Sequence, residues 1–342
     1  MTKKSLATSL SIVAASAAAV SLSGRSLAPA DASLATPPTR LTAQLQSADL
    51  LVSGLGAASG STVGPDGALY VTHGGTGTIS RVDPETGART TFASGLPAAL
   101  IPGLGGVMDV VFIGRTAYAL VTLVGSDIGG TSVVGVYRVD GPSQFTVIAD
   151  IGQFSIDNPP QTAFDVPSGL QFALDRYHHG FLVTDGHHNR VLRVSIDGAI
   201  TEFMGFDNIV PTGLAILGNR VYMAEAGAVP HLPEDGRVVL LRPKKSLTLE
   251  VASGARLLVD VEWHRGRALY ALSQGELPPG GIPATPALPN TGSLVQANAD
   301  GTFAVIASPL NQPTSLEFIG DVAYIVTLGG DVWTVDIEHH GR

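Results

Sequence analysis

Short apolar runs recur along the chain, and Gly, Pro and Asp-Gly turns separate them. A run that ends in an apolar strand, usually with a tyrosine, occurs six times: 67-GALYVT, 115-RTAYALVT, 180-GFLVTD, 220-RVYMAEA, 267-RALYALS and 321-DVAYIVT. A short strand precedes each run, a second run such as 78-TISRVDP follows each, and a third follows five of them. The pattern predicts six units of four strands. No segment shows a sustained helical period, so folds built from βαβ units are excluded.

The sixth unit stops at Ile337 without a fourth strand. The missing strand is found near the other end of the chain, where 50-LLVSGLG resembles 91-TFASGLP of the first unit. Four-stranded units repeated around an axis are typical of β-propellers. The sequence therefore predicts an all-β fold, a six-bladed β-propeller with four-stranded blades over residues 41–337, closed by an N-terminal strand that completes the last blade. A long β-solenoid is the alternative, but its repeats would be shorter and more regular.

The first thirty residues have the features of an export signal. Two lysines come first, residues 5–22 are small and apolar, and 28-APA-30 is an A-x-A-like cleavage site. We expect a cleavable signal peptide over residues 1–30, a flexible segment over 31–40 and a C-terminal tail over 338–342. The mature protein is then expected to be secreted or periplasmic.

Charge narrows the classes of partner. Residues 1–30 hold three of the 20 basic residues and none of the 29 acidic ones, so the mature chain carries 17 minus 29, or −12. A chain this acidic repels phosphate backbones and anionic lipids, and we expect neither nucleic acid nor membrane as a partner. The chain has no cysteine, so no disulfide can form, and its stability must come from core packing. We expect a monomer.

One face of the predicted ring carries the long loops. Neighbouring strands are antiparallel, so the loops that follow the second strand of each unit share a face with the connections between units. Three of these loops are long, whereas the opposite face has short turns such as 64-GPDG. We therefore expect a small molecule or a protein to bind at the mouth of the channel on the long-loop face. The candidate binding residues there are His73, Asp157, Asn158, Asp185, His187, His188, Glu225 and His231.

The stretch 184-TDGHHNRVLRV is the most conspicuous polar motif. The same turn exists in every unit, mostly without histidine, so Asp185, Asn189 and Arg190 are interpreted as a fold signature that bonds turn backbone. Adjacent histidines in an extended turn point in different directions, and we interpret His187 and His188 as solvated loop residues. A cluster of histidines at the rim is the alternative.

The predicted inner strands carry a second constellation. Their alignment places six residues in one register near the mouth: Gly60, Asp109, Gly169, Gly213, Asp260 and Ser315. Asp109 and Asp260 are three blades apart and should face each other across the channel. They can be metal ligands for a hard cation such as Ca²⁺, a catalytic acid and base, or acceptors for backbone amides. The chain has no G-x-S-x-G, H-E-x-x-H, phosphate-loop or dinucleotide motif, so whether it is an enzyme stays open.

Several of these stretches resemble the ScyD/ScyE family of exported, NHL-repeat-like propellers. The resemblance rests on 60-GSTVGPDGALYVTHGGTGTISRVDP, 166-VPSGLQF, 184-TDGHHNRVLRV and 211-PTGLAILGNRVY. It implies a propeller and export, and no particular reaction. The layout is more distantly similar to gluconolactonase and strictosidine-synthase propellers, and the first of these implies a divalent cation held by channel Glu, Asn and Asp residues. Two function classes follow: a binding propeller, or a metal-assisted lactonase-like hydrolase that uses Asp109 and Asp260.

Overall fold

The computed structural model describes residues 45–160 and 166–337. The predicted signal peptide, the segment 31–40 and the tail 338–342 lie outside these residues. The described residues belong to one compact unit, Ala43–Arg342. No helix among them is long and apolar enough to cross a bilayer.

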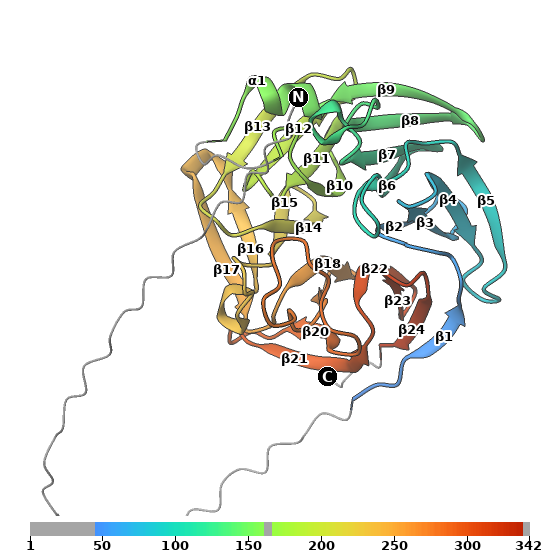
Figure 1. Ribbon diagram of the computed structural model, residues 1–342. Helices are drawn as coiled ribbons and strands as arrows, with labels where there is room; N and C mark the ends of the chain where they lie inside the picture. Colours follow the sequence, from blue (N-terminus) through green and yellow to red (C-terminus); the bar gives the residue numbers. More distant parts are fainter. Residues whose placement is uncertain (1–44, 161–165, 338–342) are drawn as a thin grey trace, which may run out of the picture. The chain divides into compact units, whose positions relative to one another are not determined.

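Twenty-four strands form six antiparallel sheets of four strands each, arranged as the blades of a ring (Figure 1). The first three blades are β2 (Ser61–Val63), β3 (Leu69–His73), β4 (Thr78–Val82) and β5 (Arg89–Ser94); β6 (Gly106–Ile113), β7 (Thr116–Thr122), β8 (Gly135–Gly141) and β9 (Gln144–Asp150); and β10 (Gln171–Tyr177), β11 (Gly180–Asp185), β12 (Arg190–Ser195) and β13 (Ile200–Gly205). The fourth and fifth blades are β14 (Pro211–Leu217), β15 (Arg220–Glu225), β16 (Arg237–Arg242) and β17 (Leu247–Ser253); and β18 (Leu258–His264), β19 (Ala268–Ser273), β20 (Gly292–Ala297) and β21 (Phe303–Leu310). The prediction of a six-bladed β-propeller is confirmed.

The ring is closed by the N-terminal strand. The sixth blade contains β22 (Pro313–Ile319), β23 (Val322–Thr327) and β24 (Val332–Asp336), and its fourth strand is β1 (Asp49–Val52). Strand β1 pairs with β24 in an antiparallel register that places Asp49 opposite Thr334 and Leu50 opposite Trp333. The inner strand β22 also contacts β2, so the first and last blades are neighbours. The predicted closure is confirmed.

The core lies between the blades. Six apolar clusters each combine side chains from two neighbouring blades, and together they cover all six interfaces around the ring. At the first interface, Tyr70 meets Phe92 and Phe112 edge-on, with ring centroids 4.9 and 4.8 Å apart. Each sheet thus buries both faces, which explains why a strand such as β3 is buried at all five positions.

One helix interrupts the all-β pattern. Helix α1 (Ile151–Asp157) lies in the connection between β9 and β10, and the side chain of Asp150 caps it by accepting from the Gln153 amide at 2.8 Å. The sequence showed no sustained helical period because seven residues are too few to produce a detectable 3.6-residue period.

The predicted register of the inner strands is correct in five blades and wrong in the third. Asp109 lies two residues before Val111, which pairs with Tyr118, and Asp260 lies two residues before Glu262, which pairs with Tyr270. In the third blade, Leu182 stands at the position of the tyrosine and pairs with Asp175. The residue two positions before Asp175 is Ala173, so Ala173 occupies the register of Asp109 and Asp260. Gly169 lies before β10 begins and does not occupy this position. The long connection before β10 allowed the sequence alignment to slip by four residues.

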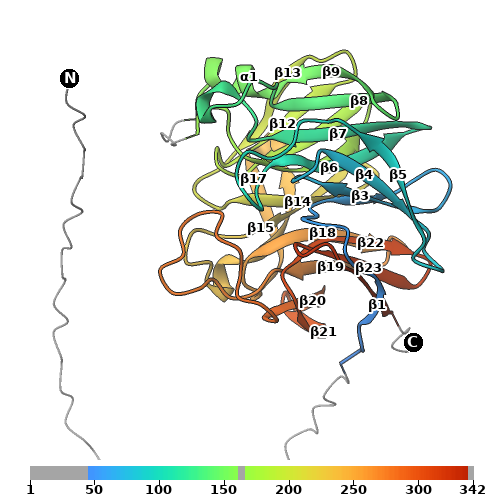
Figure 2. The ribbon, with the colours of Figure 1, turned by 45° about the vertical axis from the view of Figure 1, so that its right-hand side comes forward.

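The two faces of the ring differ as predicted. The connection that carries α1 and the loop between β19 and β20 project to the same side, which we call the mouth face (Figure 2). Tight turns such as the one between β14 and β15 lie on the opposite face.

Removing β1 should destabilise the whole ring. A chain that begins at Gly54 loses the partner of β24 and the burial of Leu51 and Val52 against the first and last blades. We expect the free energy of unfolding to fall by about 3 kcal/mol and the exposed edge to promote aggregation. The matched control begins at Leu45, keeps β1 and should unfold like the full chain in urea. Equal unfolding midpoints for the two truncations would contradict the closure.

Candidate functional site

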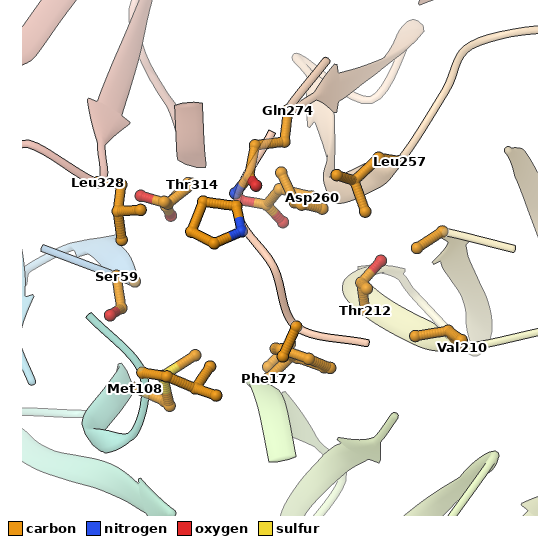
Figure 3. A pocket seen from close by; sticks show the side chains of 18 of the residues that line it. Ser59, Met108, Phe172, Val210, Thr212, Leu257, Asp260, Gln274, Thr314 and Leu328 are labelled. Carbon is orange, nitrogen blue, oxygen red and sulfur yellow. The ribbon is translucent and has the colours of Figure 1, made fainter. Parts of the chain in front are cut away.

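A cavity of about 150 Å³ lies at the mouth of the ring, and we call it the mouth cavity. All six blades contribute to its wall, and the labelled side chains surround an open space (Figure 3). Most of the wall is apolar, with the larger side chains being Leu104, Met108, Phe172, Val210, Leu257, Val259 and Leu328. Ligand pockets are typically apolar with a few placed polar groups. The predicted long-loop face therefore does contain a pocket.

A smaller cavity of about 50 Å³ continues from it, lined only by residues of the inner strands. We call it the acid channel because five carboxyl side chains line it: Asp109, Asp175, Asp260, Glu262 and Glu317. Asp109, Ala173, Asp260 and Ser315 line both cavities, so the two spaces are contiguous. The two aspartates stand at the boundary between an apolar and an acidic space.

Each boundary aspartate links its blade to the next one. Asp109 accepts the amide of Leu174 in the third blade at 2.7 Å, and Asp260 accepts the amide of Leu316 in the sixth blade at 2.7 Å. The second oxygen of each carboxyl accepts the amide of the following residue, at 2.8 and 2.9 Å. These contacts match the expectation that the aspartates bond backbone amides, and the Ser315 side chain adds a further hydrogen bond to Asp260.

Glycine in the preceding blade makes room for each aspartate. A Cβ atom on Gly60 would lie 2.3 Å from Oδ1 of Asp109, and one on Gly213 would lie 2.5 Å from the Cα of Asp260. The Gly–Asp pair thus occurs twice, three blades apart. A larger residue at either glycine would displace the carboxyl that joins two inner strands.

The environment of the acid channel favours protonated carboxyls. Burial raises the pKa of Asp109, Glu262 and Glu317 well above the usual range, and the surrounding carboxylates raise these values further. Burial likewise raises the pKa of Asp175 and of Asp260 to about 7. The lining contains no lysine or arginine among the described residues, and Arg176, next to Asp175 in the chain, offsets the rise in the pKa of Asp175 only in part.

His231 is the one predicted histidine that lines the mouth cavity. Its side chain is buried, with 5% of the residue exposed, and its Nδ1 lies 2.9 Å from the carbonyl oxygen of Gly227 and 3.1 Å from that of Ala226. Two acceptors at this nitrogen require it to carry a proton. In the neutral ring, Nε2 is then the unprotonated nitrogen and accepts hydrogen bonds.

The TDGHHNR motif forms a buried network away from the mouth cavity. Arg190 donates from Nε to Asp185 at 3.2 Å and from its terminal nitrogens to Ser155 at 2.9 Å and to the Asn158 carbonyl at 2.8 Å. The ring of His188 lies 2.9 Å from the Asp185 carboxylate. The arginine thereby fixes α1 and its C-terminal end against the turn. The contacts agree with the fold-signature interpretation, whereas the interpretation of His188 as solvated was wrong because the network buries it.

The remaining candidates lie elsewhere. His73 is buried beside Ser80 at 2.9 Å, and burial lowers its pKa to about 4. Glu225 is buried 3.1 Å from Arg237 on a groove between the third and fourth blades, and burial raises its pKa to about 7. Asp157 is an exposed residue of α1.

His187 is half-buried in the turn after β11. Of the eight predicted binding residues, the structure therefore brings only His231 to the mouth cavity.

Three channel carboxyls escaped the sequence analysis: Asp175, Glu262 and Glu317. Alternate residues of a strand share a face, so Glu262 should point the same way as Asp260, and Glu317 the same way as Ser315. This period of two was the signal that could have found them. Asp175 was missed because the inner strand of the third blade was aligned four residues early.

The residues present do not fit a calcium site of the gluconolactonase kind. Calcium takes six to eight oxygen ligands. In the register of Asp109 and Asp260, the other four blades supply only Gly60, Ala173, Gly213 and Ser315. Within residues 45–160 and 166–337, no group of three or more His, Cys, Asp or Glu side chains is arranged to hold a metal ion. We therefore derive no metal-dependent step.

Comparisons with known proteins show the fold. No protein-family model and no curated protein sequence matches the chain. Among solved structures, a gluconolactonase from Xanthomonas campestris is similar with a TM-score of 0.59 and 12% identity, over 88% of this chain and 93% of the other. Virginiamycin B lyase from Staphylococcus aureus is similar with a TM-score of 0.51 and 12% identity, over 85% and 99%. A protein from Thermus thermophilus described as a glucose dehydrogenase gives 0.53 and 15%, over 85% and 99%. At these identities the likeness concerns the propeller alone.

Replacing Arg190 should test the structural role of the motif. Arg190→Met leaves the buried Asp185 carboxylate without its guanidinium partner, and we expect a loss of about 3–5 kcal/mol in the free energy of unfolding. The control Arg193→Met changes an exposed residue of the same strand and should stay within about 0.5 kcal/mol of wild type. Urea unfolding measures both. A small loss for Arg190→Met would show that the pair contributes little to the fold.

The acid channel should make the protein more stable in weak acid than in weak base. A carboxyl whose pKa is raised in the folded state contributes stability that is fully present below its unfolded pKa, near 4, and is lost as the pH rises through the folded pKa. Asp175 and Asp260, at about 7, place this loss between about pH 4 and pH 7. We expect the thermal midpoint to fall by several degrees over this range, and less in Glu317→Gln. A midpoint that rises with pH would contradict this.

Proposed function

We propose that the protein binds a small, mainly apolar molecule in the mouth cavity. The observation that carries the proposal is the cavity itself: a space of about 150 Å³ on the mouth face, with mainly apolar walls and two aspartates at its base. A protein partner would need a broader docking surface than a cavity of this size offers. The long loops of the fourth and fifth blades, which contribute His231 and Gln274 to the lining, then help to shape the ligand site.

The proposal includes the setting expected from the sequence. The signal-peptide pattern supports export, and the quoted repeats support membership of the ScyD/ScyE type of propeller. A binding protein outside the cytoplasm that works as a monomer agrees with the acidic chain and its lack of cysteine. Each of these points rests on the sequence alone.

A lactonase-like hydrolase is the second candidate, and one observation favours it. A gluconolactonase is among the structural neighbours, with a similar ring over most of both chains. Asp109 and Asp260 are the carboxylates that such a hydrolase would use, and each already accepts two backbone amides. A metal-dependent enzyme would be stabilised by its ion, so a higher thermal midpoint with CaCl₂ than with EDTA would support this candidate.

Filling the cavity should abolish binding. Leu328→Trp places a bulky side chain in the wall of the mouth cavity, and Leu217→Trp places the same side chain at a half-exposed position on the opposite face. With 2-phenylethanol as a neutral apolar probe in isothermal titration, we expect Leu328→Trp to weaken binding at least about tenfold and Leu217→Trp to leave it unchanged. Equal binding by both variants, or no binding by wild type, would refute the proposed function.

A further inference from the structure

We propose that the ligand of the mouth cavity carries a protonated amine on its apolar body, and that the amine is directed toward the acid channel. This inference rests on the proposed function and specifies the chemical class of the ligand. The geometry that supports it is the direct contact between an apolar space and an acidic one, with Asp109 and Asp260 lining both.

The polar groups of the mouth cavity are mainly acceptors. The hydroxyl of Thr212 donates to the Leu258 carbonyl at 2.8 Å, and the hydroxyl of Thr314 donates to the Val326 carbonyl at 3.3 Å. Each threonine therefore offers its oxygen as an acceptor only. Ser59, Gln274 and Thr285 are lining side chains that can still donate, because Gln274 uses its oxygen to accept the Ala287 amide and the Thr285 hydroxyl accepts the Ile282 amide.

His231 adds an acceptor that is independent of the carboxyl cluster. The carbonyls of Ala226 and Gly227 hold the Nδ1 proton, so Nε2 is the acceptor of the neutral ring. The ring is buried and lines the same cavity. An ammonium group has three N–H donors and no lone pair, so it can donate to this nitrogen.

The charge of the two cavities selects a cation over a neutral donor. Asp109, Asp175, Asp260, Glu262 and Glu317 surround the axis, and neither lining includes a lysine or an arginine among the described residues. An anionic ligand would face these groups without any partner. A cation close to them would relieve the repulsion that keeps them protonated.

The rim of the mouth supports the apolar part of the ligand. Exposed large apolar side chains flank the cavity-lining segments of three connections: Leu100 and Ile101 beside Leu104, Val229 and Leu232 beside His231, and Ile282 and Leu288 beside Pro286. Apolar groups gathered at the entrance and along the wall indicate that the ligand buries hydrocarbon rather than a polar surface.

Amine binding should be coupled to proton release. Carboxyls protonated at neutral pH lose their protons when a cation binds beside them, so affinity should rise from pH 5 to pH 8. The titratable groups that face the amine are the five channel carboxyls and His231. The amine itself, with a pKa near that of lysine at about 10, stays charged throughout.

The experiment compares three probes of similar size: 2-phenylethylamine, 2-phenylethanol and phenylacetate. Isothermal titration of the full mature protein at pH 8 should show the amine binding at least about tenfold more tightly than the alcohol and the carboxylate not at all. Titration in two buffers with different ionisation enthalpies should detect released protons for the amine only. At pH 5 the preference for the amine should shrink.

Two variants test the direction of the amine. Asp260→Asn removes a charge at the boundary, and Glu317→Gln removes one deeper in the channel without changing the size of the side chain. Each should reduce the preference for the amine to within about threefold and leave the affinity for the alcohol unchanged. Glu317→Gln keeps the test valid if Asp260→Asn unfolds, because Asp260 also holds the Leu316 amide.

The outcomes separate this inference from the proposed function. Equal binding of amine and alcohol would refute the amine and leave the binding function intact, and so would tighter binding of phenylacetate. Tight binding of CaCl₂ that excludes the amine would assign the acid channel to a metal ion and also refute the inference. If none of the three probes binds, both proposals fail.

Discussion

The structure depends on how the open edges of six sheets are satisfied around one axis. The inner strand of every blade is an edge strand, and its free amides would be buried without partners if the blades merely approached one another. Asp109 and Asp260 each accept an amide from the next blade, and Ser315 does the same for Ser61 across the closing interface. Glycines in the preceding blades leave room for both aspartates. The polar side chains along the axis are therefore needed to satisfy the backbone of the fold, whether or not they also bind a ligand.

This requirement gives the axis two chemical zones. Near the mouth, loops and the first residues of inner strands supply apolar side chains, among them Leu104, Met108, Phe172 and Leu328. Deeper in, the inner strands alone form the wall, and Asp175, Glu262 and Glu317 add carboxyls to those already present. Burial raises the pKa of these groups, so the channel holds protons that a suitable ligand can displace. Function can thus arise from groups whose first role is structural.

The architecture was readable from the sequence because propeller repeats are local. Each strand of a blade lies next to its neighbour in the chain, so the six units, the four strands and the closing strand near Leu51 could all be predicted. The site was harder to predict. Its residues come from loops of different blades, and only packing decides that His231 reaches the cavity while His188 turns to Asp185. Gly60 and Asp109 lie in different blades, and the repeat pattern predicts strands within a blade but not contacts between blades.

The closing strand also has a consequence for how the protein is made. Asp49 meets Thr334 across 285 residues of chain, whereas the other strands pair within hairpins. Bringing such distant segments together carries the largest entropic cost of any step in the assembly. Five blades can form in order as synthesis proceeds, but the sixth is complete only after β24 has been made. Until then β1 and the first blade lack their partners, and chains in this state would expose apolar surface that holding factors can cover.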